Sequence, residues 1–190
     1  MLGRLVFKRL AQMACLVIAL TLAAISILSR IQTVHTVFAH LLALGPGLIG
    51  SYLRAAYYKF TLRELSLDTT INFGSYFVLP VCSIGSRVSV GSFCVVGLAR
   101  IGMGTQIGSH VMIPSGRHQH ARDEHGNLSL SKNEEIRVGE QCWIGDGAIV
   151  MADVGDGTTI GAGIVVTKPL SARAVAVGNP ACVIQEQSAS

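Results

Sequence analysis

The apolar positions follow one pattern in the first third of the chain and a different pattern in the remainder. Residues 10–29, LAQMACLVIALTLAAISILS, contain no charged side chain and suffice for a helix that reaches across the apolar core of a bilayer. Residues 31–53 contain no Asp, Glu, Lys or Arg, but Gly45-Pro46-Gly47 interrupts them and should end a helix. The pattern predicts one full-length apolar helix followed by a shorter, broken one.

The next segment has the composition of a helix at a membrane surface. Residues 51–65, SYLRAAYYKFTLREL, mix tyrosines with basic side chains, as interfacial helices do. The side chains concerned are Tyr52, Arg54, Tyr57, Tyr58, Lys59 and Arg63. A cleaved signal peptide would leave the second apolar stretch on a secreted protein with unpaired cysteines, and a buried hairpin in a soluble domain would have little polar sequence to cover it. We therefore expect residues 1–65 to form an apolar helical region that associates with a membrane.

From about Asp68 an aliphatic residue recurs at every sixth position and is nearly always followed by glycine. The units are INFGSY, IGSRVS, VGSFCV, IGMGTQ and IGSHVM before an interruption, and VGEQCW, IGDGAI, VGDGTT and IGAGIV after it. Neither a helix nor an alternating strand has this period. The pattern indicates a coil of short strands and tight turns, whose inward aliphatic residues become buried as successive coils stack. We place this domain at residues 66–190.

The interruption, SGRHQHARDEHGNLSLSKNEEIRVG, begins at Ser115 and ends at Gly139. We expect an inserted loop at about residues 115–135, because a projecting loop offers the flat faces of a coil a place for functional side chains. The loop contains His118, His120 and His125. Histidine suits a general base because its unperturbed pKa is about 6.5.

Composition narrows the classes of function. Apolar residues make up 50% of the 190 residues and charged residues 14%, so part of the chain is expected to meet lipid. The net charge of +4 comes without a dense basic run or interleaved aromatics, which argues against a nucleic-acid partner. The five cysteines are odd in number and form no C-x-x-C, which favours buried thiols over a disulfide scaffold or a zinc knuckle.

The repeat region resembles the hexapeptide-repeat acyltransferases. The resemblance is strongest in CWIGDGAIVMADVGDGTTIGAGIVVTKPLSARAVAVGNPACVI, residues 142–184, whose W-I-G, I-G-A-G, V-T-K and V-G-N-P-A elements are similar, in order, to those of sugar O-acetyltransferases. The apolar N-terminus with PGLIGSYLR and FGSYF is most similar to acetyltransferases of bacterial polysaccharide synthesis. The resemblance implies a mainly β fold, a left-handed parallel β-helix with an apolar helical N-terminal region. It also implies a homotrimer with acetyl-CoA bound between adjacent β-helices.

The resemblance also implies roles for single residues. IPSGRH corresponds to the element that carries the family's catalytic histidine, which places the base at His118, or at His120 if the register of the loop differs. The implied contacts with acetyl-CoA are Asp146, Ala162, Thr167 and Lys168. A basic residue usually follows the family's G-N-P-A element, and this chain has Cys182 there.

The expected activity is an acetyl-CoA-dependent O-acetyltransferase that acts on a sugar hydroxyl of a polysaccharide or lipid-linked saccharide precursor. An N-acetyltransferase on an amino sugar and a non-catalytic β-helix scaffold in a membrane synthesis complex stay open as alternatives. No metal is expected, because His118, His120 and His125 crowd one loop while zinc needs three convergent ligands. Because acetyl-CoA is cytosolic and the basic start of the chain prefers that side, we expect the β-helix on the cytosolic face of the inner membrane, in contact with membrane lipid.

Overall fold

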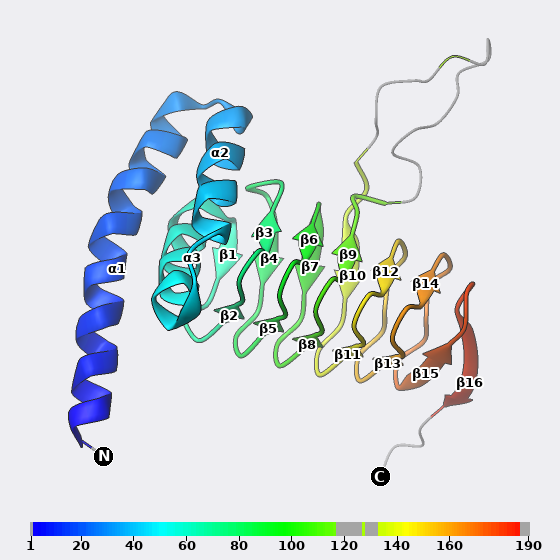
Figure 1. The fold of residues 1–190 in the computed structure, drawn as a ribbon. Helices are drawn as coiled ribbons and strands as arrows, with labels where there is room; N and C mark the ends of the chain where they lie inside the picture. Colours follow the sequence, from blue (N-terminus) through cyan, green and yellow to red (C-terminus); the bar gives the residue numbers. More distant parts are fainter. Residues whose placement is uncertain (1, 117–126, 128–132, 187–190) are drawn as a thin grey trace.

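The computed structural model describes residues 2–116, 127 and 133–186 (Figure 1). Helices α1 (Leu2–Ser29), α2 (Gln32–Ala43) and α3 (Gly47–Thr61) come first, and short strands follow. The strands are β1 (Glu64–Leu65), β2 (Thr70–Ile71), β3 (Tyr76–Phe77), β4 (Ser83–Ile84), β5 (Ser89–Val90), β6 (Val95–Val96), β7 (Ala99–Ile101), β8 (Gln106–Ile107), β9 (Met112–Ile113), β10 (Ile136–Val138), β11 (Trp143–Ile144), β12 (Ile149–Val150), β13 (Thr159–Ile160), β14 (Val165–Val166), β15 (Ala174–Val177) and β16 (Cys182–Glu186).

The strands form three sheets that run the length of the coil (Figure 1). The first sheet has the order β1-β4-β7-β10, the second β16-β15-β13-β11-β8-β5-β2, and the third β14-β12-β9-β6-β3. The strands pair in parallel, except for the antiparallel pair β15 and β16. Along the coil, successive turns add their strands side by side to the same sheets. The predicted coil of short strands and tight turns is confirmed.

The aliphatic residue of each six-residue unit lies inside the coil, as its period predicts. In the second sheet the register stacks Ile71, Val90, Ile107, Ile144 and Ile160 one above another, and all five are buried. Each coil thus buries its apolar row against its neighbours.

Two corners of the coil matter for function. The loop corner joins the third sheet to the first and contains Pro80, Leu98, Ser115–Gly116 and Thr167–Lys168. The opposite corner joins the second sheet to the third and contains Asp146–Gly147 and Ala162–Gly163, where the Gly163 amide donates to the Asp146 carbonyl at 2.8 Å.

The three helices close the coil at its first turn (Figure 1). The break predicted at Gly45-Pro46-Gly47 is present, because α2 ends at Ala43 and α3 begins at Gly47. The prediction of an interfacial helix at residues 51–65 was wrong for its central side chains. Arg54, Tyr57 and Tyr58 are fully buried, because α3 packs between α1 and the first coil and its inner face covers the open end of the β-helix.

Polar groups on the inner face of α3 find partners across this interface. The Tyr58 hydroxyl accepts a hydrogen bond from the Phe77 amide at 3.1 Å, and burial raises the pKa of that hydroxyl. The Arg54 guanidinium donates to the carbonyl oxygens of Leu42, Gly45 and Ile71 at 2.9, 2.7 and 3.0 Å. The Arg54 side chain therefore joins the end of α2, the break after it and the first coil.

Helix α1 is the outermost layer, and its two faces differ. Its inner face contacts α3 with the buried small residues Cys15, Ala19 and Ala23. Its outer face exposes large apolar side chains: Leu10, Met13, Val17, Ile18, Leu20, Ile25, Ile27 and Leu28. The segment Leu10–Ser29 has a mean hydropathy of 2.3 and only 22% of it is buried, so by length and composition it is apolar enough to cross a membrane.

Candidate functional site

The inserted loop leaves and re-enters the coil through a tight neck. Strand β9 ends at Ile113, and the chain returns at Glu134, whose amide donates to the Ser115 carbonyl at 2.9 Å. The Ser115 hydroxyl accepts from the Leu98 amide of the previous coil at 2.8 Å. Gly116 has a φ of 86°, and a Cβ there would lie 2.7 Å from Cβ of Glu134. The two ends of the loop are thus fixed to each other and to the coil.

The predicted catalytic residues His118 and His120, and also His125, lie outside the described residues. Gly116, at the neck, is two positions before His118. Among residues 2–116, 127 and 133–186, no His, Cys, Asp and Glu side chains group as three or more possible metal ligands.

The four residues predicted to contact acetyl-CoA lie at two corners of the coil and not in one cluster. Asp146 and Ala162 occupy adjacent coils at the opposite corner, and both are exposed. Thr167 and Lys168 follow β14 at the loop corner, and Lys168 is exposed. One oxygen of the Asp146 carboxylate accepts a hydrogen bond from the Ser109 amide, so this side chain also fixes its own corner.

The outer face of the third sheet lies between these two corners, and its outward side chains are apolar. Register stacks Tyr76, Val95, Met112, Ile149 and Val165 along the coil. We call these five side chains the apolar strip. Met112 is 46% exposed, and the other four are half-buried. The strip therefore runs beside the neck of the loop and is bordered by all four predicted cofactor residues.

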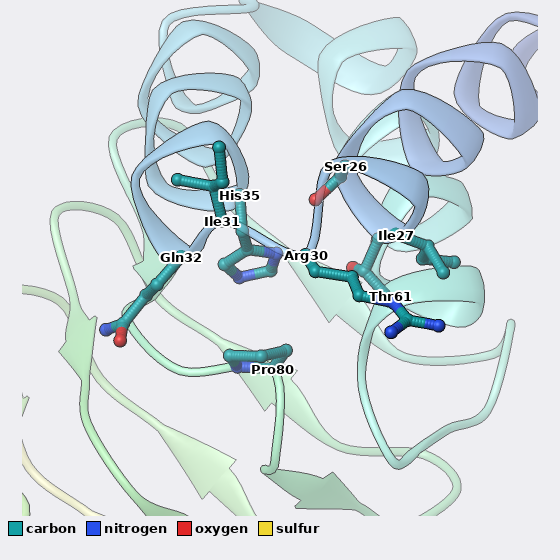
Figure 2. Close-up of a pocket in the computed structure, with 8 residues that line it drawn as sticks. All are labelled: Ser26, Ile27, Arg30, Ile31, Gln32, His35, Thr61 and Pro80. Carbon is teal, nitrogen blue, oxygen red and sulfur yellow. The ribbon is translucent and has the colours of Figure 1, made fainter.

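Two hollows among the described residues lie away from the apolar strip. One, of about 300 Å³, lies where α1 passes into α2, against Pro80 (Figure 2). The other, of about 340 Å³, lies at the corner between the first and second sheets and is lined by Asp156 and Arg173. The predicted cofactor residues line neither of these two hollows.

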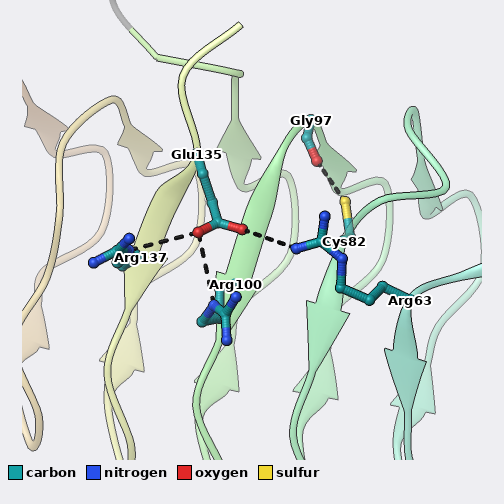
Figure 3. A network of polar contacts seen from close by, with 6 residues as sticks. All are labelled: Arg63, Cys82, Gly97, Arg100, Glu135 and Arg137. Atoms are coloured by element: carbon teal, nitrogen blue, oxygen red, sulfur yellow. Dashed lines mark hydrogen bonds and ion pairs between the residues drawn. The ribbon is translucent and has the colours of Figure 1, made fainter.

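A cluster of arginines lies on the first sheet directly after the neck (Figure 3). Glu135 makes ion pairs with Arg63, Arg100 and Arg137 at 3.7, 3.7 and 3.5 Å. Arg100 and Arg137 face each other in register on β7 and β10. Three arginines thus surround one carboxylate. Sequence reasoning missed this cluster. The signal that could have found it is the arginine at the second position of both ARIG and IRVG, which are Arg100 and Arg137.

One cysteine beside this cluster is a buried thiol. Cys82 is fully buried, its sulfur donates to the Gly97 carbonyl at 2.8 Å, and burial raises its pKa to about 11. It is therefore protonated at neutral pH. The expectation of buried thiols holds for Cys15, Cys82, Cys94 and Cys142, whereas Cys182 is exposed.

We compared the chain with known proteins to find those that it resembles. No protein-family model matches the chain. The chain is 40% identical over 75 residues to a relative from Escherichia coli K12 named "Putative colanic acid biosynthesis acetyltransferase WcaF". That match covers 38% of this chain and 39% of the relative, so it spans about two-fifths of the relative's length.

Solved structures match over more of the chain. A maltose O-acetyltransferase from Clostridium difficile 630 has a TM-score of 0.67 at 21% identity, covering 80% of this chain and 83% of that one. A hexapeptide-repeat containing acetyltransferase from Vibrio cholerae has a TM-score of 0.66 at 17% identity, covering 78% and 88%. The chain has the fold of the hexapeptide-repeat acetyltransferases, and part of its sequence is similar to relatives named acetyltransferases. The predicted left-handed parallel β-helix with an apolar helical N-terminal region is thereby confirmed.

Proteins with this fold differ in acceptor chemistry. AntD, an N-acyltransferase from Bacillus cereus, was solved with dTDP and 3-hydroxybutyryl-CoA. It has a TM-score of 0.53 at 18% identity, covering 68% of this chain and 86% of that one. An O-acetyltransferase and an N-acyltransferase therefore share this fold, and the fold alone does not select the acceptor atom.

Proposed function

We propose that this chain is an acetyl-CoA-dependent O-acetyltransferase that acts on a sugar hydroxyl of a membrane-associated saccharide precursor. The observation that carries the proposal is the juxtaposition of the loop neck with the apolar strip. Thr167 and Lys168 lie at the corner from which the histidine-bearing loop leaves, and Asp146 and Ala162 lie across the strip from them. The similarity to the colanic acid acetyltransferase of E. coli supports a saccharide acceptor.

The chemistry assigns a task to each part of this region. The loop histidine, His118 in our proposal and His120 as the alternative, takes the proton of the acceptor hydroxyl. The hydroxyl oxygen attacks the thioester carbon, and the C–S bond then breaks and releases the CoA thiolate. The apolar strip suits the pantetheine arm, and the exposed Lys168 suits a phosphate of the cofactor. Holding donor and acceptor along one rigid face supplies the proximity that direct transfer requires.

Steady-state transfer by purified protein in mild detergent tests the proposal. CoA release from acetyl-CoA is measured with candidate sugar precursors and with matched amino sugars. Release that depends on a hydroxyl acceptor is expected, whereas release that requires the amine would favour an N-acetyltransferase. A non-catalytic scaffold predicts no release and no stabilisation by CoA. For a binding protein, ligand at a hundred times Kd raises the free energy of unfolding by about 2.7 kcal/mol.

We also propose that the active form is a homotrimer. On one chain the predicted cofactor residues border an exposed face, so a neighbouring copy is needed to enclose the arm of the cofactor. The Met112→Glu variant places a charge at the centre of the apolar strip. Because a buried unpaired charge costs several kcal/mol, the variant should be monomeric at micromolar concentration and lack transferase activity. Light scattering after size-exclusion chromatography measures the mass.

Gln106→Glu is the matched control for this prediction. Gln106 is exposed on β8, in the same coil as Met112, but it lies on the outer face of the second sheet. It should remain trimeric and active. A fully active monomer of either variant would contradict the assignment of a shared site.

We propose that α1 lies in the plane of the membrane surface and does not cross it. A helix of 28 residues is about 42 Å long, and α1 runs across the end of the coil with α3 along its inner side (Figure 1). If α1 crossed the bilayer, α3 and the flank of the first coil would have to enter lipid with it. With α1 in the plane, its outer face meets lipid and the β-helix stands on the cytosolic side.

Thiol labelling tests this orientation. A cysteine at position 2 should react with an impermeant reagent only after intact cells are permeabilised. The native Cys182 is exposed at the far end of the coil and serves as an internal control with the same expected behaviour. Labelling at position 2 but not at Cys182 in intact cells would show that α1 crosses the membrane.

A further inference from the structure

The hollow at the junction of α1 and α2 has the features of a binding site. It has a volume of about 300 Å³ and is open to solvent. Its walls come from the end of α1, the start of α2, the end of α3 and the first coil (Figure 2). The side chains used below are Ile27, Arg30, His35, Thr61 and Pro80. We call this hollow the junction pocket.

His35 brings an unsatisfied polar atom to the junction pocket. His35 is 3% exposed, and Nε2 makes no hydrogen bond within the geometric limits to any described residue, although the Phe77 backbone lies close enough to the ring to affect its pKa. Its other ring nitrogen, Nδ1, lies 3.2 Å from the hydroxyl of Tyr57. In Figure 2 the ring lies above Pro80, with one nitrogen turned toward that residue. An unpaired buried polar group costs about 1–3 kcal/mol, so a ligand atom that pairs with Nε2 would remove this cost.

The other polar groups of the pocket indicate an anion. Among the described residues that line it, Arg30 is the one with a permanent charge, and none is Asp or Glu. The Thr61 hydroxyl donates to the Tyr57 carbonyl at 3.0 Å, so the donors left for a ligand are the Arg30 guanidinium and the His35 ring. Where Tyr57 donates to Nδ1, the imidazole presents an Nε2–H donor as well. A guanidinium together with an imidazole N–H is a donor pair suited to phosphate oxygens.

The pocket also opens onto apolar surface. Ile27 lines it and is 55% exposed, and the adjacent Leu28 is 81% exposed on the outer face of α1. This is the face that we place in lipid. A phosphate attached to a hydrocarbon chain can therefore enter the pocket while its chain stays in the membrane.

We propose that the junction pocket binds the phosphate group of a lipid, as a phosphomonoester or a terminal diphosphate. The location connects it to the proposed transferase site. Pro80 and Ser115 lie at the same corner two coils apart, and adjacent coils are spaced by about 4.8 Å, so the pocket and the loop neck are separated by about 10 Å along the coil. A saccharide carried on that lipid phosphate would extend toward the loop. This last step rests on the proposed function, whereas phosphate binding does not.

Vesicle binding by the purified full-length protein tests the pocket. Phosphatidylcholine vesicles with phosphatidic acid offer a lipid phosphomonoester, and vesicles with phosphatidylglycerol at matched surface charge offer an anionic phosphodiester. We expect tighter binding to the phosphatidic acid vesicles. Arg30→Gln should lose about tenfold of that affinity, because it removes a charge-assisted hydrogen bond.

Arg87→Gln is the matched control. Both arginines are exposed and both have left-handed backbones, with φ of 53° at Arg30 and 56° at Arg87. Arg87 lies between β4 and β5, away from the pocket. Equal loss of affinity in the two variants would assign binding to general electrostatic attraction and overturn the proposal. So would unchanged binding of Arg30→Gln.

A second variant and two further measurements complete the test. His35→Phe keeps a ring but removes Nε2, and it should reduce the preference for phosphatidic acid while its melting temperature reports on folding. Inorganic phosphate should displace the vesicles poorly. Full displacement at an equal phosphate concentration would identify a soluble phosphate and overturn the lipid source. Wild-type transfer to the candidate sugar precursors, lipid-linked ones included, is measured in parallel. If no transfer occurs but the vesicle preference remains, the proposed function fails and the pocket assignment stands.

Discussion

Replacement of His118 by alanine should lower kcat by about 10²–10⁴-fold and leave the affinity for acetyl-CoA nearly unchanged. The range is the usual cost of removing a positioned general base. The cofactor contacts that we propose lie on the coil and not in the loop, so binding of the donor should survive. The loss should therefore appear in kcat and not in KM.

The neck of the loop explains why His118 is favoured over the other two histidines. Ser115 is buried and bonded to both Leu98 and Glu134, which fixes the chain three residues before His118. A catalytic group must be held within about 0.5 Å of its productive position, and this becomes harder with distance from a rigid element. His120→Ala should therefore lose less activity than His118→Ala, and His125→Ala should lose little.

Three measurements on each histidine variant separate the outcomes. They are kcat, the affinity for CoA and the melting temperature. An inactive His120→Ala beside an active His118→Ala would mean that the loop register taken from the family is wrong. Full activity in all three variants would remove the loop from the mechanism and leave the scaffold alternative.

The coil could be predicted from the sequence because its signal is local and repeated. An aliphatic residue at every sixth position fixes which side chain points inward, and Ile144 and Ile160 stack as that period requires. The break in the helical region was equally local, since Gly45-Pro46-Gly47 stops a helix wherever it occurs. Handedness was not in the residues and came from the family resemblance.

The role of α3 could not be predicted because its composition fits two environments. Tyrosines and basic residues on a helix suit a lipid interface, and they equally suit a cap that must satisfy backbone groups at the end of a coil. Arg54 pairs with carbonyls at Leu42 and Ile71, which are distant in sequence, so only the tertiary arrangement decides between the two. Sequence reasoning also missed the junction pocket, because its walls combine residues as far apart as Ile27 and Pro80.

The roles of the candidate site residues stay predictions, and the structure shows only where the described ones lie. The four cofactor positions were named one by one from motifs, and the structure places them around one outer face. The arginine cluster at Glu135 went unnoticed because the inserted loop separates Arg100 from Arg137 by 37 positions, whereas other coils repeat after 16 to 19. Because of the insertion, the spacing of the two arginines in the sequence does not reveal that they pair in register.

The second large effect is expected at Arg54, where Arg54→Met should lower the free energy of unfolding by about 3 kcal/mol. Methionine preserves most of the volume and the apolar stem of the side chain but cannot donate a hydrogen bond. The carbonyl oxygens of Gly45 and Ile71 would lose the bonds that Arg54 donates at 2.7 and 3.0 Å, inside a closed interface. Since unfolding in a chain of this size shifts by about 2–4 °C per kcal/mol, the melting temperature should fall by about 10 °C.

Arg63→Met is the matched control for the Arg54 variant. It makes the same exchange just beyond the end of α3, but the Arg63 side chain is 54% exposed and makes a 3.7 Å ion pair with Glu135. Such surface pairs contribute about 0–1 kcal/mol, so its melting temperature should change little. Arg54→Lys should recover only part of the loss, because one ammonium cannot reach carbonyls on α2, the break and the first coil at once. Thermal unfolding measures the stability of each variant. Limited proteolysis at Gly45-Pro46-Gly47 measures how readily the helices α1 to α3 separate from the coil. Equal melting temperatures for Arg54→Met and Arg63→Met would mean that the helices are held to the coil by apolar contact alone.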